Sequence, residues 1–180
     1  MCGNAHCLVG GSRLRNGMLN FIPNATSVLP TTDISADSTE WKNIAQDGTF
    51  EDYVGNSITA LGFAWDATNN VWVLRNNIPG RTSAMKPSSS KACAFADFAI
   101  DNITVPAYLY DLARMPVASL SSSYGDCRNS MNVSGGEYIP VRGGGYDNGV
   151  NAHIFRCDNS DRRTYKYSAE GFFSAYYGTF

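Results

Sequence analysis

Two short apolar runs separated by turn-forming residues give the clearest local pattern in the chain. Residues 61–65 and 71–75 are rich in aromatic and aliphatic side chains, and residues 66–70 have the sequence DATNN. Asp and Asn favour turns, whereas aromatic and β-branched residues favour strands. The pattern therefore predicts a β-hairpin, with Trp65 and Trp72 on its buried face.

The middle of the chain predicts one strand followed by one helix. Residues 92–100 (ACAFADFAI) form an almost continuous apolar run and predict a strand. Residues 104–115 predict a helix, with Thr104 as its cap, Pro106 in its first turn and Pro116 after its end. The apolar stripe of this helix, with spacing i, i+3, i+4 and i+7, consists of Val105, Tyr108, Leu109 and Leu112.

The rest of the chain predicts short strands and loops. We expect short strands and loops over residues 1–40, and a loop over residues 117–137. Further strands are expected at residues 138–142, 152–156 and 172–177. Many short strands with few helices predict an α+β fold, with a β-rich N-terminal part and an irregular second half.

One polar connection is the best candidate for a boundary within the chain. Residues 76–91 contain Pro, Gly and Ser and join the predicted hairpin to the predicted strand. The boundary divides the chain into a β-rich part, residues 1–90, and a second part, residues 91–180. A chain of 180 residues suits one domain, so the two parts are also compatible with packing as one unit.

The net charge and the lengths of the apolar runs argue against nucleic acids and membranes as binding partners. The net charge of −2 does not favour nucleic acid or an anionic membrane surface, so neither is expected as a partner. No apolar run approaches the length of a membrane span, so no membrane insertion is expected. The first residues, MCGNAHCLVGG, lack the layout of a signal peptide, and none is predicted.

Residue types that carry catalysis or bind metals are sparse. The histidines are His6 and His153, and no Ser lies in a G-x-S-x-G elbow. Cys2, His6 and Cys7 provide half of a zinc site without the second pair of ligands. The cysteine count is odd and fits no disulfide framework, so buried free thiols are expected, Cys93 above all. No metal and no cofactor are predicted.

The closing stretch has an unusual composition. Residues 142–180 contain no Leu, Met, Trp, Pro or Gln, and are rich in Tyr, Asn, Asp, Ser, Arg and Gly. Tyr offers a large contact area with few rotamers, and Ser, Gly and Asn offer adaptable hydrogen bonds, as in antibody paratopes. The composition alone fits either a binding surface or an irregular polar surface. Within it, Asp158 and Asp161 are better explained as charges of a loop than as an acid–base pair, and the Arg162-Arg163 pair as surface charge or a structural ion pair.

The order of motifs in this stretch resembles one known family. Residues 142–155 have the sequence RGGGYDNGVNAHIF, followed by Arg163-Thr164 and Gly171-Phe172. This order resembles the variable proteins of diversity-generating retroelements, which have the C-type lectin fold of formylglycine-generating enzymes. The family pattern, RGG-x-W-N-N-G-x-N-A-G-V-F followed by Arg-Ser and Gly-Phe-Arg, lies over residues 142–173 without a gap.

The resemblance covers about the last half of the chain. Residues 95–113 are similar to the first strand and helix of the family, so the resemblance implies a C-type lectin fold. The chain departs from the pattern at Tyr146, where the family has Trp, and at Phe173, where it has Arg.

The residues at the Asn positions of the pattern fit the copying mechanism of the family. In such systems template adenines are miscopied during reverse transcription, so AAC or AAT codons become Asp, Ser, Tyr, His, Gly or Ala codons but never stop codons. The chain has Asn or one of these products at Asp147, Asn148, Asn151, Asp158, Ser160, Asp161, Tyr165, Tyr167, Ser168 and Ala169. The resemblance implies that these residues form a variable ligand-binding face together with Tyr146, Val150, His153 and Arg156. It implies a constant scaffold of Arg142, Gly143, Gly144, Gly149, Phe155, Arg163, Gly171 and Phe172.

The function that the resemblance implies is binding, not catalysis. The expected partner is a protein or surface receptor of a host or neighbouring cell, because the best-known member is a phage tail-tip receptor-binding protein. The expected location is a virion tail or a cell surface. Trimers occur among relatives, so a symmetric homo-oligomer is compatible with this function.

Three alternatives remain open at this point. An oxidase of the formylglycine-generating type would need a pair of cysteines near the C-terminus, where the chain has Cys157 alone. A calcium-dependent lectin would need a Glu-Pro-Asn or Gln-Pro-Asp motif, which the sequence lacks. A virion protein of fixed specificity, or with no binding role, would show no variation over residues 147–169.

Overall fold

The computed structural model describes residues 6–8, 11–23, 31–124, 127–143, 156–164 and 170–171, with the backbone alone described in the first and last of these segments. The strands are β1 (His6–Leu8), β2 (Ser12–Arg15), β3 (Met18–Phe21), β4 (Lys42–Ile44), β5 (Phe50–Asp52), β6 (Gly62–Asp66), β7 (Val71–Arg75), β8 (Lys91–Ala94), β9 (Ala99–Ile100), β10 (Arg128–Met131), β11 (Glu137–Tyr138), β12 (Val141–Arg142), β13 (Cys157–Asp158) and β14 (Glu170–Gly171). The helical segments are α1 (Ala107–Asp111) and the 3₁₀ turns η2 (Ile78–Gly80), η3 (Phe95–Asp97) and η4 (Ala118–Ser123).

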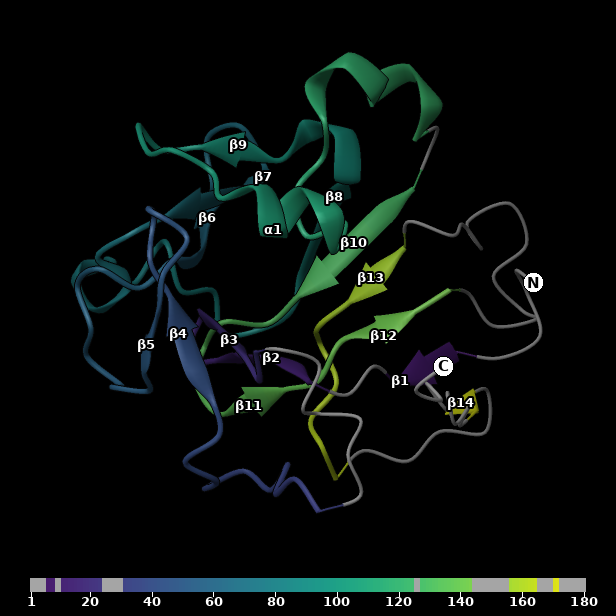
Figure 1. The fold of residues 1–180 in the computed structure, drawn as a ribbon. Coiled ribbons are helices and arrows are strands. Elements are labelled where there is room, and N and C mark those ends of the chain that lie inside the picture. The colour runs from purple at the N-terminus through teal and green to yellow at the C-terminus, as the bar shows by residue number, and fades with distance from the viewer. Residues whose placement is uncertain are drawn as a thin grey trace.

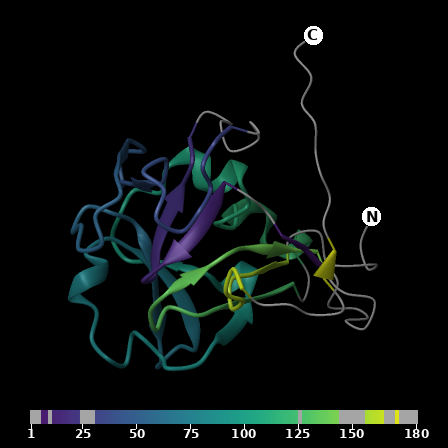
Figure 2. The same cartoon turned by 90° about the horizontal axis from the view of Figure 1, so that it is seen from below.

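Within the described residues the strands form three sheets (Figure 1). The largest has the order β11-β2-β3-β6-β7-β9, with β4 paired to β3 and β5 paired to β4. The second has the order β13-β12-β1-β14, and the third pairs β10 with β8. The strands of the largest sheet curl around the core instead of lying flat, as the view from below in Figure 2 shows. The fold is therefore mixed α+β, as predicted, with mostly strands and few helices.

The predicted hairpin is confirmed. Strands β6 and β7 pair antiparallel, and Trp65 lies directly opposite Trp72. Both indoles are buried, and their rings meet edge to face with centroids 5.0 Å apart. The carboxylate of Asp66 accepts hydrogen bonds from the backbone N–H groups of Thr68 and Asn69 and so holds the turn.

One hydrophobic core takes side chains from both parts of the chain. Strand β11, which follows the polar connection, pairs with β2, which precedes it. The same core cluster contains, among others, Leu14, Phe21, Leu61, Trp72, Leu74, Phe95, Leu109, Tyr124, Met131 and Tyr138. The β-rich part over residues 1–90 and the part over residues 91–180 therefore pack as one unit in the described residues.

The strand predicted over residues 92–100 is wrong as a continuous element. It consists of β8, the 3₁₀ turn η3 and the short strand β9. In a continuous strand, Phe95 and Phe98 would point to opposite faces because they are three residues apart. The turn brings both rings into the core instead, edge to face with centroids 5.3 Å apart.

The helix predicted over residues 104–115 is much shorter, because α1 covers Ala107–Asp111 alone. Pro106 occupies the N-cap position and no side chain caps the helix, so the predicted role of Thr104 is wrong. The helix ends early because Ala113 adopts a left-handed conformation, with φ of 48°. The N–H groups of Arg114 and Met115 both donate to the carbonyl of Leu109, which turns Arg114 toward the interior.

Two further predictions require correction. The strand predicted over residues 138–142 is divided into β11 and β12, which belong to different sheets, because Pro140 has no N–H to donate to a ladder. The loop predicted over residues 117–137 contains η4 and the four-residue strand β10.

The predicted short strands of the N-terminal 40 residues are confirmed by β1, β2 and β3. The strands predicted at residues 152–156 and 172–177 lie outside the described residues, apart from Arg156, which directly precedes β13. Among the described helices, none has the length and apolar character that a membrane span requires.

Candidate functional site

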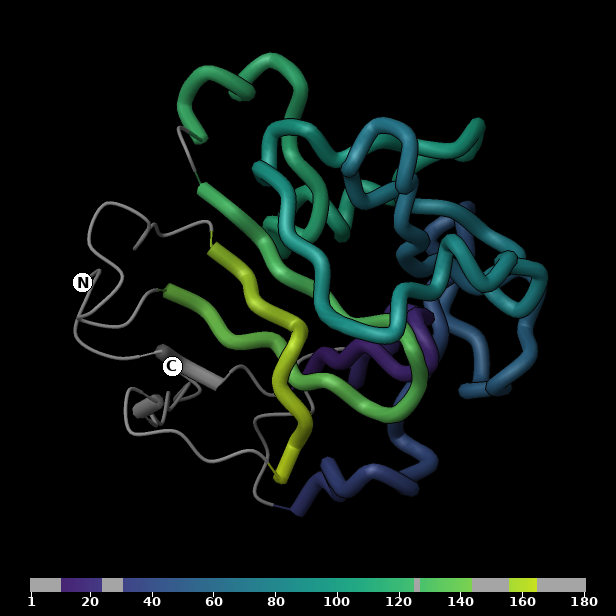
Figure 3. The backbone as a smooth tube through the Cα atoms, turned by 180° about the vertical axis from the view of Figure 1, so that it is seen from behind, coloured from purple at the N-terminus to yellow at the C-terminus, as the bar shows by residue number. Residues whose placement is uncertain are grey.

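The described segment of the closing stretch, residues 156–164, runs between fixed strands on both sides. Strand β13 pairs antiparallel with β12, and Asn159 forms a parallel bridge with Met131 of β10. Further along, Arg162 forms an antiparallel bridge with Tyr138 of β11. Figure 3 shows this segment in yellow between the two green segments that contain β10 and β12. The backbone of the segment is thus positioned by strands that lie outside it.

Backbone hydrogen bonds connect the segment to both neighbours. The N–H of Asn159 donates to the carbonyl of Ser130 at 2.7 Å, and its carbonyl accepts from the N–H of Asn132 at 3.2 Å. On the other side, the N–H of Ile139 donates to the carbonyl of Asp161 at 3.1 Å. These bonds join backbone groups, so they do not depend directly on which side chains the segment carries.

Side-chain burial alternates along the segment. Cys157 and Asn159 are 2% and 4% exposed, whereas Asp158, Ser160 and Asp161 are partly exposed. Over residues 157–160 this is the two-residue period of a strand with one face in the core and one toward solvent, and Asp161 departs from it because it is partly exposed although it lies two residues after the buried Asn159. The three outward residues are all positions at which the resemblance predicts variation.

The inward residues surround a buried arginine. Nη1 of Arg114 donates to Sγ of Cys157 at 2.8 Å and to Oδ1 of Asn159 at 3.1 Å, and its Nη2 donates to Oγ of Ser12 at 3.4 Å. Burial lowers the pKa of the Arg114 guanidinium, and the adjacent Cys157 thiol opposes this effect. Nδ2 of Asn159 also donates to Sγ of Cys157 at 3.4 Å. The cluster fixes the inward face of the segment to the end of α1.

The far end of the segment is held by an ion-pair cluster. Arg163 donates through Nε and Nη2 to the two carboxylate oxygens of Glu137, at 2.7 and 3.0 Å. Nη1 of the fully buried Arg13 donates to the same carboxylate at 2.7 Å. Burial alone would raise the pKa of Glu137, but the hydrogen bonds and charges of Arg163 and Arg13 outweigh it, so the pKa lies below its ordinary value. Arg163 thus connects the far end of the segment to strand β11 through Glu137.

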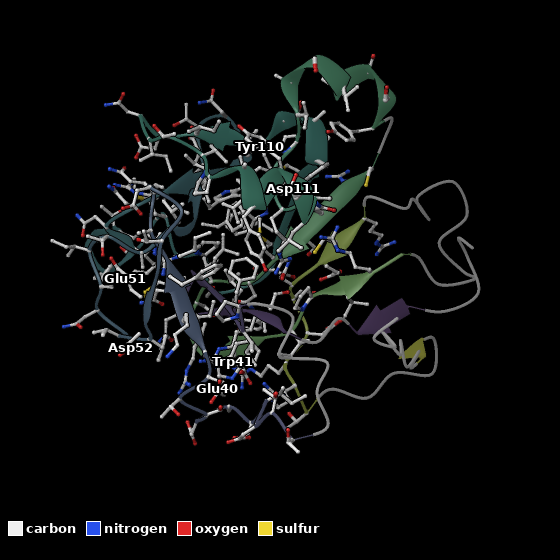
Figure 4. All side chains as sticks on the ribbon, viewed as in Figure 1. Glu40, Trp41, Glu51, Asp52, Tyr110 and Asp111 are labelled. Carbon is white, nitrogen blue, oxygen red and sulfur yellow. The ribbon has the colours of Figure 1, made fainter. Side chains whose placement is uncertain are left out.

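Stacking supports Arg13 in this cluster. Its guanidinium carbon lies 4.3 Å from the ring centroid of Trp41 and 5.2 Å from that of Tyr53. Trp41, labelled in Figure 4, lies near the end of the chain segment that enters β4. Nε of Arg13 also donates to Oδ1 of Asn20 at 3.1 Å. The buried charge is therefore held by a carboxylate, an amide and two aromatic faces.

Three other predicted scaffold residues are described. Nη2 of Arg142 donates to the carbonyls of Leu112 and Ala113, which are free of helical partners at the end of α1. Gly143 has φ of 79°, a conformation that residues with a Cβ rarely adopt. Gly171 lies in β14, which pairs with β1 in the same sheet as β12.

A cavity of about 450 Å³ opens beside the segment. The segment contributes Ser160, Asp161, Arg162 and Thr164 to its lining, and the surrounding chain contributes Ser88, Asn132, Ser134 and Tyr138. Its lining is rich in hydroxyl, amide and charged groups, and its volume is in the range of small-ligand sites. Two of the positions at which variation is predicted, Ser160 and Asp161, therefore line this cavity.

Of the predicted binding residues, the structure describes Arg156, Asp158, Ser160 and Asp161. Oδ1 of Asp158 accepts hydrogen bonds from the N–H and the hydroxyl of Ser160, which closes a tight turn. The binding residues that lie outside the described residues are Tyr146, Asp147, Asn148, Val150, Asn151, His153, Tyr165, Tyr167, Ser168 and Ala169. The scaffold residues Gly144, Gly149, Phe155 and Phe172 lie outside them too.

Cys93, Cys127 and Cys157 are buried free thiols, as expected for Cys93. Burial raises the pKa of Cys93 and of Cys127 to about 11, which disfavours the nucleophilic thiolate at neutral pH. Cys157 is also free and buried, beneath Arg114. In the described part of the chain, no three His, Cys, Asp or Glu side chains come together as a metal site.

Several residues that organise the site had no predicted role, among them Arg114, Glu137, Cys157 and Asn159. Residues 157–161 (CDNSD) contain one apolar side chain, Cys157, so the sequence shows no apolar–polar alternation that would place Cys157 and Asn159 on one face. Local sequence gives no signal for Arg114 and Glu137 either. The partners of Arg114 lie 43 and 45 residues away, and Glu137 lies 124 residues from Arg13.

Comparison with protein-family models finds no match to the chain, and comparison with curated proteins finds none either.

Proposed function

We propose that this chain is a ligand-binding protein that presents a diversified face, of the type produced by diversity-generating retroelements. The observation that carries the proposal is the alternation of burial in residues 157–160. Side chains at positions of predicted variation point outward, and the intervening side chains are buried in a hydrogen-bonded cluster. Such a segment separates the residues that recognise a ligand from those that maintain the fold.

Physical considerations support this separation. Substitution of a partly exposed side chain away from buried networks usually changes stability by less than about 0.5 kcal/mol. Removal of one partner from a buried hydrogen-bonded group costs about 1–3 kcal/mol, and more where a charge is involved. Asp158, Ser160 and Asp161 belong to the first class, whereas Cys157 and Asn159 belong to the second. Variation at the outward positions is therefore compatible with one constant backbone.

The C-type lectin fold is part of the same proposal. In support of it, β1 near the N-terminus lies between β12 and β14, so the first and last described strands share a sheet. The likeness of residues 142–173 to the family pattern is the second support.

Affinity would come chiefly from the aromatic residues of the variable stretch. Tyr146, Tyr165 and Tyr167 provide a large contact area, and the hydroxyl and carboxylate groups of Ser160 and Asp161 provide the polar surround. The partner proposed is a protein or surface receptor of a host or neighbouring cell, bound from a virion tail or a cell surface. Display in many copies would strengthen weak binding at single sites.

A pair of displayed libraries tests the proposal. The first library randomises Asp158, Ser160 and Asp161, and the matched control library randomises Cys157, Asn159 and Glu137. Each library is sorted for resistance to protease and then panned against two unrelated proteins, lysozyme and serum albumin.

The proposal predicts that most members of the first library resist protease and that panning enriches binders to each target. It predicts that most members of the control library are cleaved. Equal protease resistance in the two libraries, or a folded first library that yields no binders to either target, would contradict the proposal.

A further inference from the structure

A second buried arginine lies outside the variable stretch and has an unusual set of partners. Arg81 is 7% exposed, and each of its hydrogen bonds goes to a backbone carbonyl. Nε donates to Ile78 at 3.0 Å, Nη1 donates to Phe63 at 2.8 Å, and Nη2 donates to Asn16 at 2.6 Å. The three carbonyls come from three separate segments, so the guanidinium is held rigidly.

The backbone around Arg81 is shaped to admit it. A Cβ atom on Gly17 would lie 2.3 Å from Nη1 of Arg81, and φ of Gly17 is +81°. Glycine is therefore required both by the conformation and by the close approach of the guanidinium. The fold therefore holds the guanidinium of Arg81 in one position.

The positive charge of Arg81 has no anionic partner among the described residues. No described carboxylate forms an ion pair or a hydrogen bond with it. Burial lowers its pKa to about 10, with a smaller contribution from the nearby Arg75, so the side chain remains a cation at neutral pH. A buried cation without a counter-charge is costly, and an anion from solution would offset that cost.

Arg81 also retains unused donors. A guanidinium carries five N–H groups, and the three carbonyls engage three of them. Hydrogen bonds from a fixed guanidinium to an oxyanion are charge-assisted and stronger than those between neutral groups. The remaining two N–H groups are therefore suited to an anionic oxygen acceptor.

Arg81 lines a cavity of about 240 Å³. Arg81 and the exposed Lys86 are its two charged lining residues, and the lining contains no Asp or Glu. Asn16, Ser134 and Gly135 add amide, hydroxyl and backbone groups to the wall. The cavity has room for a tetrahedral oxyanion.

We propose that this cavity binds an oxyanion, such as a phosphate or sulfate group, between the guanidinium of Arg81 and the ammonium of Lys86. The site consists of residues outside the stretch predicted to vary. It shares Ser134 with the larger cavity beside residues 160–164, so a ligand group held here lies next to the variable face. The proposal does not depend on variation of that face.

Titration of the purified chain with sodium phosphate and with sodium sulfate tests the site. Binding is measured by calorimetry and by the shift in Tm, with sodium chloride at matched ionic strength as reference. Lys86→Gln removes a charged donor from an exposed side chain, and we expect oxyanion affinity about tenfold weaker, the loss of one charge-assisted hydrogen bond. The matched control is Lys91→Gln, which neutralises an exposed lysine outside the cavity and should bind as the parent does.

Binding that K86Q weakens and K91Q preserves supports the site. Oxyanions that raise Tm no more than chloride does would overturn it, as would equal affinities in K86Q and the parent. Arg81→Lys is a second variant, which keeps the positive charge but loses the planar guanidinium with its several N–H donors, so it should weaken oxyanion binding. The Tm of this variant without added oxyanion shows separately whether it folds. None of these outcomes bears on the diversified face, whose test uses other residues.

Discussion

At the scale of single residues, buried arginines hold the fixed side of the candidate binding face. Arg114 donates hydrogen bonds to the buried side chains of Cys157 and Asn159. At the far end of the segment, the Glu137 carboxylate forms ion pairs with both Arg13 and Arg163. Each cluster links residues that are distant in sequence. The stability of the binding face is therefore expected to depend on inward polar contacts more than on the residues that face solvent.

Asn159→Ala is expected to destabilise the protein by about 2–3 kcal/mol, because it leaves a buried Arg114 donor without its amide acceptor. The matched control, Ser160→Ala, removes a hydroxyl from a partly exposed side chain and should cost less than about 1 kcal/mol. Urea unfolding of the two variants measures the difference. Equal losses in both would show that the inward and outward positions are not distinct.

Glu137→Gln is expected to lower stability at pH 7 by about 3 kcal/mol, because the fully buried Arg13 loses its counter-charge. The pKa of Glu137 is lowered in the folded protein, so its contribution is present above the unfolded value and is lost as pH falls through the folded value. Parent and variant should therefore converge in stability at acidic pH.

Urea unfolding from pH 7 down to pH 3 measures this convergence. Glu137→Asp serves as the control, since it retains the charge while shortening the side chain. A difference between parent and E137Q that stays constant with pH would contradict the account of this cluster.

At the scale of secondary-structure elements, the sequence predicted those elements whose determining residues lie close together along the chain. The β6–β7 hairpin was predictable because its turn residues and its two tryptophans lie within one short stretch. The break between β11 and β12 was also predictable in principle, since Pro140 cannot donate to a ladder. The early end of α1 was not, because it depends on the burial of Arg114 against Cys157 and Asn159, more than 40 residues further along the chain.

Ala113→Gly is expected to stabilise the protein by about 0.5–1 kcal/mol. Ala113 has φ of 48° at the end of α1, a conformation that glycine adopts without a steric penalty. Ala107→Gly at the start of the same helix is the control and should cost roughly 0.5–1 kcal/mol, since glycine disfavours an ordinary helical position. Urea unfolding measures the stability of both variants. A gain in stability for Ala113→Gly and a loss for Ala107→Gly would support the left-handed conformation of Ala113 as the reason why the helix ends there, whereas a loss of stability in both variants would contradict it.

At the scale of the whole molecule, the two parts separated by the polar connection depend on each other. Strand β2 needs β11 as a neighbour, and Trp72 and Leu74 share a core with Phe95 and Leu109. The sequence predicted the α+β class from its many short strands. It could not predict how strands from the two parts pair, because register between distant segments is fixed by tertiary packing.

A fragment of residues 1–90 is therefore expected to be unfolded, because it lacks β11, β9 and half of the core. Near-UV circular dichroism and amide hydrogen exchange of the fragment, with the full chain as control, measure this. A cooperative unfolding transition in the isolated fragment would instead show an independent N-terminal domain.

The candidate site, too, was predictable only in the features that are determined by local sequence. Local sequence indicated the residue types of a displayed surface, and in the structure Asp158, Ser160 and Asp161 are partly exposed. The clusters around Arg114 and Glu137 could not be predicted, since their members are brought together by the fold. The sequence therefore indicates the outward residues of the candidate face, whereas the contacts beneath them are known from the structure alone.

The most direct measurement of the central claim is to sequence this gene, with its flanking DNA, in many individuals of its source population. The account predicts that substitutions cluster at the codons for residues 147–169, with Asp158, Ser160 and Asp161 variable and Cys157 and Asn159 constant. It predicts a near-copy with AAC or AAT at the variable codons, beside a reverse-transcriptase gene. An invariant segment with no template copy would contradict the account and leave a domain of fixed specificity, for which the enzyme and calcium-lectin alternatives would again require testing.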